Sequence, residues 1–214
     1  MKLLGIVGGI SPESTIEYYR LIAAEHVPIV ISSIDLDPLV AMLDRGDVAS
    51  FTAAIAAELQ RLGRAGAEMA IVAANTPHMV FDELQRRSPV PLVSIVEATV
   101  AEAAKRGLRR PALFGTRFTM QAHFYPDAFV RPSAEEQDVI HSIYFGELVK
   151  GVFRDESRAR LLAIVEAMRA RDGIDGVILG GTELPLILRQ GDAALPLLDT
   201  TRIHVAAALA AVRG

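Results

Sequence analysis

The sequence contains no cysteine among its 214 residues. This absence excludes disulfides, thiolate nucleophiles, iron–sulfur clusters and cysteine-based zinc sites. A basic excess is missing as well, because 26 acidic and 22 basic side chains give a formal net charge of −4. Without a basic stripe to contact a phosphate backbone, no nucleic acid is expected as a partner.

Long hydrophobic runs are also absent. The apolar stretch that follows Met1 ends at Gly8 and Gly9, too soon for a signal peptide or a membrane span. We therefore expect a cytoplasmic protein that does not interact with a membrane. With 51% hydrophobic and 22% charged residues, the chain has the composition of a globular protein that buries a sizeable core.

Apolar strands alternate with amphipathic helices in the first half. Short apolar runs at residues 3–7, 28–34 and 68–74 predict strands. Ser11 offers an N-cap hydroxyl, and Pro12 and Glu13 favour a helix start; the helix that follows has Ile16, Tyr19 and Ala23 on one face. A second helix has its apolar residues at Phe51, Ile55, Leu59 and Leu62. This alternation predicts a parallel sheet covered by helices on both sides.

The second half repeats these landmarks. Phe114-Gly115 follows Val7-Gly8 by 107 residues, and Gly181-Thr182-Glu183 follows Ala74-Asn75-Thr76 by the same number. We therefore predict two similar Rossmann-like α/β domains, each with a short parallel sheet flanked by helices. The first comprises residues 1–97 together with 200–214, and the second comprises residues 98–199.

Ligands of open α/β sheets bind beyond the carboxyl ends of the strands, so the loops at those ends are candidate sites. The first such loop contains Gly9, Ile10 and Ser11, where the glycine lets a ligand approach the backbone and the helix N-terminus favours an anion. The alternative interpretation is an ordinary tight turn. It is neither a dinucleotide fingerprint nor a Walker loop, so no nucleotide is expected.

The loop after the third strand places Asn75, Thr76 and His78 just before a helix. Asn75 or Thr76 can instead cap that helix, and a lone histidine is more often structural than catalytic. In the second half the corresponding loops contain further hydroxyls, a guanidinium and a carboxylate, at Thr116, Arg117, Thr119, Thr182 and Glu183.

Arg45 is a further candidate, because a guanidinium binds a carboxylate through two hydrogen bonds. Its alternative role is that of a solvated loop charge. The five histidines are widely spread and have no metal-ligand spacing, and the sequence has no nucleophile elbow. We expect neither a metal nor a cofactor.

Several short segments together resemble the aspartate/glutamate racemase family, and most of all its broad-specificity amino-acid racemases. The segments follow one another along almost the whole chain: residues 8–15 (GGISPEST), 18–20 (YYR), 75–78 (NTPH), 115–120 (GTRFTM), 124–125 (FY), 181–183 (GTE) and 197–200 (LLDT). The resemblance implies two similar α/β domains with a ligand cleft between them, a small acidic amino acid as substrate, independence from pyridoxal phosphate and a homodimer.

In members of the resembled family, two cysteines remove and deliver the α-proton on opposite faces of the substrate carbon. The resemblance places them directly before Asn-Thr and directly before Thr-Glu, where this chain has Ala74 and Gly181. Neither residue can carry a proton, so two-thiol racemisation is not expected here. The loss is either natural or the result of laboratory substitution; a natural cysteine-free sequence is favoured, because glycine is not a usual engineered replacement.

Two functional hypotheses follow. As an enzyme of this family, the protein would use His78 as acid or base and Glu183 as its counterpart or orienter. Thr76 and Thr182 would donate to a carboxylate. Decarboxylation or elimination would suit such a site, because either reaction needs only one proton carrier. As a binding protein, it would hold a small carboxylate or amino acid without chemistry. Both hypotheses predict the same binding residues.

Overall fold

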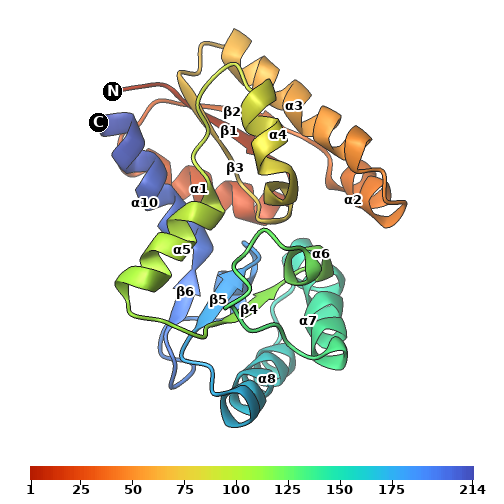
Figure 1. The fold of residues 1–214 in the computed structure, drawn as a ribbon. Coiled ribbons are helices and arrows are strands. Elements are labelled where there is room, and N and C mark those ends of the chain that lie inside the picture. Colours follow the sequence, from red (N-terminus) through yellow and green to blue (C-terminus); the bar gives the residue numbers. More distant parts are fainter. The chain divides into compact units, whose positions relative to one another are not determined.

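The computed structural model describes residues 1–214 and divides into two compact α/β units (Figure 1). Unit 1 comprises residues 1–94 and 204–214, and unit 2 comprises residues 95–203. These divisions lie three or four residues from the boundaries that the sequence suggests. No helix has the length and apolarity needed to cross a membrane.

Unit 1 contains three strands with helices between them. Its elements are β1 (Leu4–Gly8), α1 (Pro12–Ala23), β2 (Ile29–Ser33), α2 (Leu36–Asp44), α3 (Val48–Arg64), β3 (Met69–Val72), a 3-10 helix η1 (Thr76–Val80), α4 (Phe81–Arg87) and most of α10 (Thr200–Arg213). All three strands are parallel, in the order β2-β1-β3, as the alternating pattern predicts.

Successive strand residues point to opposite faces of this sheet, so both faces are apolar. Helices cover each of them. On one face Leu4 and Ile6 pack with Tyr18 and Ile22 of α1 and with Val205 of α10. On the other face the core comes from α2, α3 and α4, and it includes all four apolar positions expected for α3: Phe51, Ile55, Leu59 and Leu62. That helix prediction is confirmed.

The buried face of α1 differs from the one that the hydrophobic residues suggest. Ile16 and Tyr19 are 60% and 54% exposed, whereas Ser14, Tyr18 and Ile22 are buried. The reason is that the hydroxyls of α1 have partners in the interior: Ser14 donates to the Ala73 carbonyl at 3.3 Å. Polar residues that find hydrogen bonds can therefore occupy the inner face of a helix.

Unit 2 has the same layout. Its elements are α5 (Ile95–Lys105), β4 (Ala112–Gly115), α6 (Arg117–Gln121), α7 (Ala134–Gly146), a 3-10 helix η2 (Leu148–Lys150), α8 (Asp155–Asp172), β5 (Val177–Gly180), α9 (Leu184–Ile187), β6 (Leu197–Asp199) and the first turn of α10. The parallel strand order is β4-β5-β6. Helices α6 to α9 cover one face, and α5 covers the other.

The two sheets correspond strand by strand. Val7 pairs with Val72, and Phe114 pairs with Leu179, each residue 107 positions after its counterpart. In unit 1 the segment at Leu92 forms a single parallel bridge to Ala70, where unit 2 has the full strand β6. In unit 2 a single bridge from Val130 to Ala112 takes the place that β2 has in unit 1. The matching layout supports the internal repeat inferred from the sequence.

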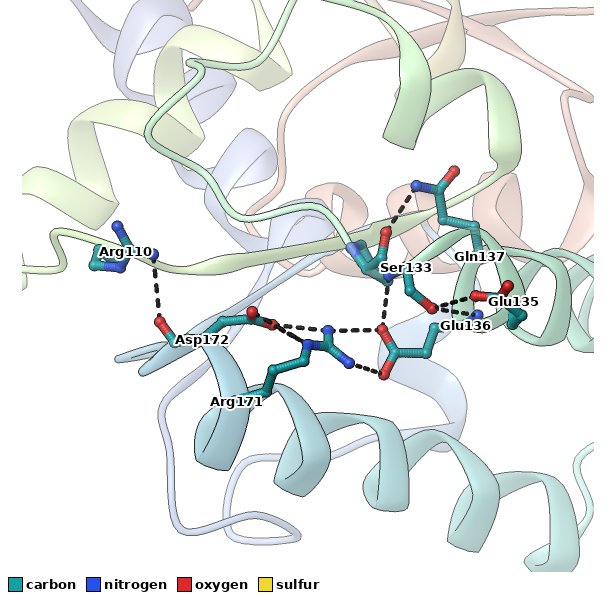
Figure 2. A network of polar contacts seen from close by, with 8 residues as sticks. Arg110, Ser133, Glu135, Glu136, Gln137, Arg171 and Asp172 are labelled. Atoms are coloured by element: carbon teal, nitrogen blue, oxygen red, sulfur yellow. Dashed lines mark hydrogen bonds and ion pairs between the residues drawn. The ribbon is translucent and has the colours of Figure 1, made fainter.

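A polar network joins the start of α7 to the end of α8 and reaches Arg110, two residues before β4 (Figure 2). Ser133 and Glu136 form a reciprocal capping box at the N-terminus of α7. Arg171 donates to both carboxylate oxygens of Glu136, at 2.8 and 3.0 Å, and also to Asp172. These hydrogen bonds from Arg171 lower the pKa of Glu136. The network links the first turn of α7 to the last turn of α8.

Candidate functional site

The loop after β1 is closely packed. Gly9 has a φ of 82°, and a Cβ there would lie 2.6 Å from Ser33 Oγ and 2.8 Å from Ile34 N, so only glycine fits. Its amide donates to Thr15 Oγ1 at 2.8 Å. Ser11, which the sequence suggests as a hydroxyl cap, makes no side-chain cap and has a φ of 104°. Instead its carbonyl accepts from Ser14 and Thr15.

The structure brings the first and second candidate loops of unit 1 together. Ser14 at the start of α1 donates to the Ala73 carbonyl, one residue before Ala74. Ala74, Asn75 and His78 are buried, whereas Thr76 is partly exposed at the start of η1. Asn75 is the N-cap residue of η1, but its side chain makes no capping hydrogen bond.

His78 belongs to a buried aromatic group at this strand end. Its Nδ1 lies 3.0 Å from the Ala74 carbonyl, which can only accept, so Nδ1 carries the hydrogen. The His78 ring is stacked on Phe81 and meets the ring of His204 edge-on at 6.1 Å. His204 Nε2 donates to the Val93 carbonyl at 2.9 Å, and its Nδ1 accepts from Tyr18 Oη at 2.8 Å.

Both histidines are uncharged at neutral pH. Burial, together with the neighbouring His204, lowers the pKa of His78 to about 3. Burial likewise lowers the pKa of His204 to about 4. The hydrogen bonds described above suit the neutral rings, since each carbonyl receives one N–H and Tyr18 finds a ring nitrogen without hydrogen. At pH 7 His78 is therefore a neutral imidazole.

In unit 2 the hydroxyls after β4 bind one another. Thr116 caps α6 by accepting from the Thr119 amide at 3.1 Å, and the two hydroxyls lie 3.2 Å apart. The Arg117 guanidinium is half exposed and contacts Asp138 at 2.8 Å, while its backbone amide donates to His141. The guanidinium thus already has a carboxylate partner on α7.

The loop after β5 holds a buried carboxylate. Glu183 is fully buried, and its Oε2 accepts from the Tyr144 hydroxyl and, at 3.2 Å, from Thr182 Oγ1. Tyr144 comes from α7, which packs on the face of the sheet to which Val177 and Leu179 of β5 point. Burial, followed by the charge and hydrogen bond of Glu183, raises the pKa of Tyr144 well above its ordinary value. The phenol therefore remains protonated.

Tyr144 also fills the space beside Gly181. A Cβ at position 181 would lie 3.0 Å from Cζ and 3.1 Å from Oη of Tyr144, and closer still to Cε2. Gly181 itself does not have a positive φ. The requirement for glycine at this position is therefore steric, and it comes from the tyrosine ring.

Arg45 lies exposed at the end of α2. The pKa of Asp47 is lowered mainly by hydrogen bonds from Ser50, and to a smaller extent by the charge of Arg45.

No group of three or more histidine, aspartate or glutamate side chains in the chain is arranged to hold a metal ion.

Sequence reasoning gave no role to Tyr144 or His204, and it named Tyr18 only as part of the YYR segment of the family resemblance. A glycine where the resembled family has a side chain is a usable signal for Tyr144, because a large neighbour has to fill the vacated volume. No comparable signal exists for the pair of Tyr18 and His204, since the two residues are 186 positions apart.

Comparison with known proteins gives a consistent result. A family model described as Asp/Glu/Hydantoin racemase matches residues 7–208. Among curated proteins, the chain is 22% identical to the broad-specificity amino-acid racemase RacX of Bacillus subtilis, over 93% of both sequences.

Solved structures agree over the whole chain. A provisionally assigned Asp/Glu racemase from Yersinia pestis is 31% identical and has a TM-score of 0.87, with complete coverage of both chains. An aspartate racemase homologue from Pyrococcus horikoshii is 35% identical and has a TM-score of 0.84, again with complete coverage.

Proposed function

Because the chain belongs to the Asp/Glu/hydantoin racemase family, we propose that it is a cofactor-independent enzyme that acts on a small carboxylate or amino acid without two-thiol racemisation. The proposal that two-thiol racemisation does not take place rests on the absence of cysteine from the whole sequence. Positions 74 and 181, where the resemblance puts the two thiols, hold alanine and glycine, and neither can accept or donate a proton.

The loops of each unit support the binding of a carboxylate. In unit 1, Asn75 and Thr76 supply hydrogen-bond donors at the end of β3. In unit 2, Thr116, Arg117 and Thr182 lie after the corresponding strands. Hydroxyl, amide and guanidinium groups are the donors that carboxylates bind. Gly9, Ile10, Ser11 and Arg45 of unit 1 and Thr119 of unit 2 remain proposed ligand contacts.

The most suitable chemistry needs a single proton carrier. Racemisation requires an acid and a base on opposite faces of one carbon, whereas decarboxylation or β-elimination proceeds with one. The neutral His78 is a weak base at pH 7, because its pKa is lowered to about 3. Glu183 is the other ionisable group of the candidate loops, and its buried carboxyl accepts from the Tyr144 hydroxyl.

The decisive experiment combines binding with isotope exchange. Aspartate, glutamate, other α-amino acids and substituted malonates are screened by calorimetry and thermal shift, and then incubated with the protein in D2O while proton NMR follows the α-proton. A ligand at 100 times its dissociation constant stabilises the folded state by about 2.7 kcal/mol. The expected result is binding together with α-proton loss or decarboxylation, without rapid racemisation. Rapid racemisation by the unmodified protein would contradict the proposal, as would the absence of binding at millimolar concentrations.

Binding without turnover of any candidate would identify the protein as a carboxylate- or amino-acid-binding member of the family. A homodimer, a cytoplasmic location and independence from pyridoxal phosphate also belong to the proposal. Size-exclusion chromatography with light scattering tests the homodimer. Activity of purified protein that has no visible-range absorbance tests the independence from pyridoxal phosphate.

A further inference from the structure

Unit 2 has a small cavity between the start of α8 and the segment that contains α9. Its volume is about 250 Å³, which is smaller than the pockets that hold drug-sized molecules and suits a ligand of few atoms. The residues that line it are Phe153, Arg154, Asp155, Arg158, Leu186, Ile187 and Arg189. None of them belongs to the candidate loops.

The wall of this cavity is rich in positive charge. Its lining contains three arginines, and Asp155 is the only acid in it. This excess contrasts with the net charge of −4 of the whole chain. A guanidinium is weakly hydrated and binds both oxygens of a carboxylate side by side. The charge of the wall therefore favours an anion over a neutral or cationic ligand.

Arg158 is held in position by Asp192. It donates through Nη2 to Oδ1 of that carboxylate and through Nε, at 3.2 Å, to Oδ2. Asp192 in turn accepts from the backbone amide of Arg189 at 2.8 Å. The pair uses two of the five N–H donors of the Arg158 guanidinium. A ligand that binds the others loses little entropy, because the side chain is already ordered.

The other two guanidinium groups have no carboxylate at hydrogen-bonding distance. Arg154 Nη1 lies 3.7 Å from Glu147 Oε1, and Glu147 already accepts from a serine hydroxyl. Arg189 binds Asp192 through its backbone amide, while its exposed guanidinium acts on that carboxylate through charge. Both cations can therefore bind an added carboxylate without breaking a direct hydrogen bond.

The rest of the wall is apolar. Leu186 and Ile187 of α9 contribute aliphatic surface, and Phe153 contributes a ring that is 44% exposed. An inorganic ion gains nothing from such a wall, whereas the hydrocarbon part of an organic anion is removed from water by it. An aromatic ligand can also pack its ring against that of Phe153. The wall therefore favours an organic carboxylate over phosphate or sulfate.

We propose that this cavity binds a small organic carboxylate, with the anionic group among the three arginines and the hydrocarbon part against Phe153 and α9. The inference goes beyond the proposed function, because the cavity shares no residue with the candidate loops. Helix α9 begins directly after Glu183, so a bound ligand contacts the helix that follows one of those loops.

Benzoate is the probe, and benzamide is its uncharged counterpart of similar shape. Calorimetry measures the affinity of each, and two-dimensional NMR of the isotope-labelled protein, including the arginine Nε–H signals, locates the site. Arg189→Gln and Arg154→Gln each remove one positive charge from the cavity, and Phe153→Ala removes the aromatic wall. Arg169→Gln is the matched control, because Arg169 lies on α8, is half exposed and has an acid at 3.6 Å. Circular dichroism checks that each variant is folded.

We expect benzoate to shift the Nε–H signals of Arg158 and Arg189 and to bind at least about tenfold more tightly than benzamide, since hydrogen bonds to charged groups are the stronger ones. Arg189→Gln and Arg154→Gln should each weaken benzoate binding by about tenfold. Phe153→Ala should weaken it by about threefold. Arg169→Gln should change it by less than about twofold, because its distant exposed charge is screened.

Parent-like affinity in both Arg189→Gln and Arg154→Gln would overturn the inference, as would equal binding of benzamide or no binding of benzoate at millimolar concentrations. Sulfate that binds the same signals as tightly as benzoate would also contradict it, since the site would then be one for inorganic anions. Benzoate shifts confined to residues 116–119 and 181–183 would contradict this inference while supporting the proposed function. Binding in the cavity alone, with no carboxylate or amino acid bound at the candidate loops, would support this inference and contradict the proposed function.

Discussion

The Tyr18 hydroxyl lies 2.8 Å from Nδ1 of His204, although α1 and α10 stand at opposite ends of the sequence. His204 also donates to the Val93 carbonyl, so its ring connects α10 to α1 and to the segment after α4. All three groups belong to unit 1. These hydrogen bonds hold α10 against α1 and against the segment that contains Val93.

Replacing Tyr18 by phenylalanine should destabilise the protein measurably. Tyr18→Phe leaves Nδ1 of the buried His204 without its donor, and an unsatisfied buried group costs about 1–3 kcal/mol. Urea unfolding followed by circular dichroism gives the difference in the free energy of unfolding. Tyr19→Phe is the control, since Tyr19 is exposed and the change should stay within about 0.5 kcal/mol. Equal stability of the two variants would contradict the assigned role.

Stability should fall as the pH drops below about 6.5. In the unfolded chain His78 and His204 bind protons near that pH, whereas in the folded protein their pKa values are lowered to about 3 and about 4. Between these limits the unfolded state binds more protons, so the free energy of unfolding decreases by about 1.4 kcal/mol per pH unit for each histidine.

Urea unfolding at pH 7.5, 6.0 and 5.0 measures this slope. The carboxylates with lowered pKa values, such as that of Asp192, titrate below this window and do not mask it. A variant with His78→Asn and His204→Gln should have a flatter profile between pH 6.5 and 5, even if it is less stable at pH 7.5. An unchanged slope in the variant would show that other groups are responsible.

A side chain at position 181 should be tolerated only when Tyr144 is made smaller. Gly181→Ala forces the Tyr144 ring to move, and overpacking of this kind costs about 1–3 kcal/mol. In a Tyr144→Leu background the same change should cost less than about 0.5 kcal/mol, so a double-mutant cycle should give a coupling of about 1 kcal/mol or more.

Gly146→Ala on α7 is the control for this cycle. A Cβ there meets no atom within 4 Å, and alanine favours the helix over glycine. That change should be neutral or stabilising. A Gly181→Ala protein as stable as its parent would rule out the steric explanation for glycine, and a thiol at position 181 would then fit without any change at Tyr144.

Arg117 should matter for affinity and not for stability. Its ion pair with Asp138 is about half exposed, so Arg117→Ala should change the free energy of unfolding by less than about 1 kcal/mol. If the guanidinium binds the ligand carboxylate, the same variant should lose about tenfold in affinity, or about 1.4 kcal/mol. Asp138→Asn should tighten binding, because it frees the guanidinium from a competing carboxylate.

Calorimetry with the ligand found in the binding screen measures both effects. Arg86→Ala provides the comparison, since Arg86 forms an exposed pair with Glu83 of the same kind. Parent-like affinity in Arg117→Ala would remove this residue from the proposed contacts.

The sequence was informative wherever the signal was local. The alternation of strands with helices, the buried positions of α3 and the repeat between the halves follow from hydrophobic periodicity and fixed spacing, whereas α2 (Leu36–Asp44) was not predicted. The face of α1 did not follow, because Ser14 finds an interior carbonyl while the apolar Ile16 and Tyr19 remain at the surface. Periodicity weighs hydrophobicity and takes no account of a distant acceptor.

The candidate loops were located correctly after their strands, but their hydrogen bonds were not foreseeable. Thr116 and Thr119 bond to one another, and Arg117 pairs with a residue of α7 that no motif marks. Tyr144 was missed because it lies in the middle of a helix, where a tyrosine ordinarily fills a core. Its importance depends on the missing side chain at 181, a relationship that only three-dimensional packing reveals.

The division of α10 between the units has a consequence for how the chain folds as it is synthesised. Residues 95–203 are complete as a unit before residues 204–214 have been made, although unit 1 begins at Met1. Until then one face of the first sheet lacks Val205, Ala208 and Val212 of α10. Vectorial synthesis ordinarily favours N-terminal units. In this chain unit 2 has all of its residues before unit 1 does. Until α10 has been made, unit 1 exposes apolar surface that favours aggregation.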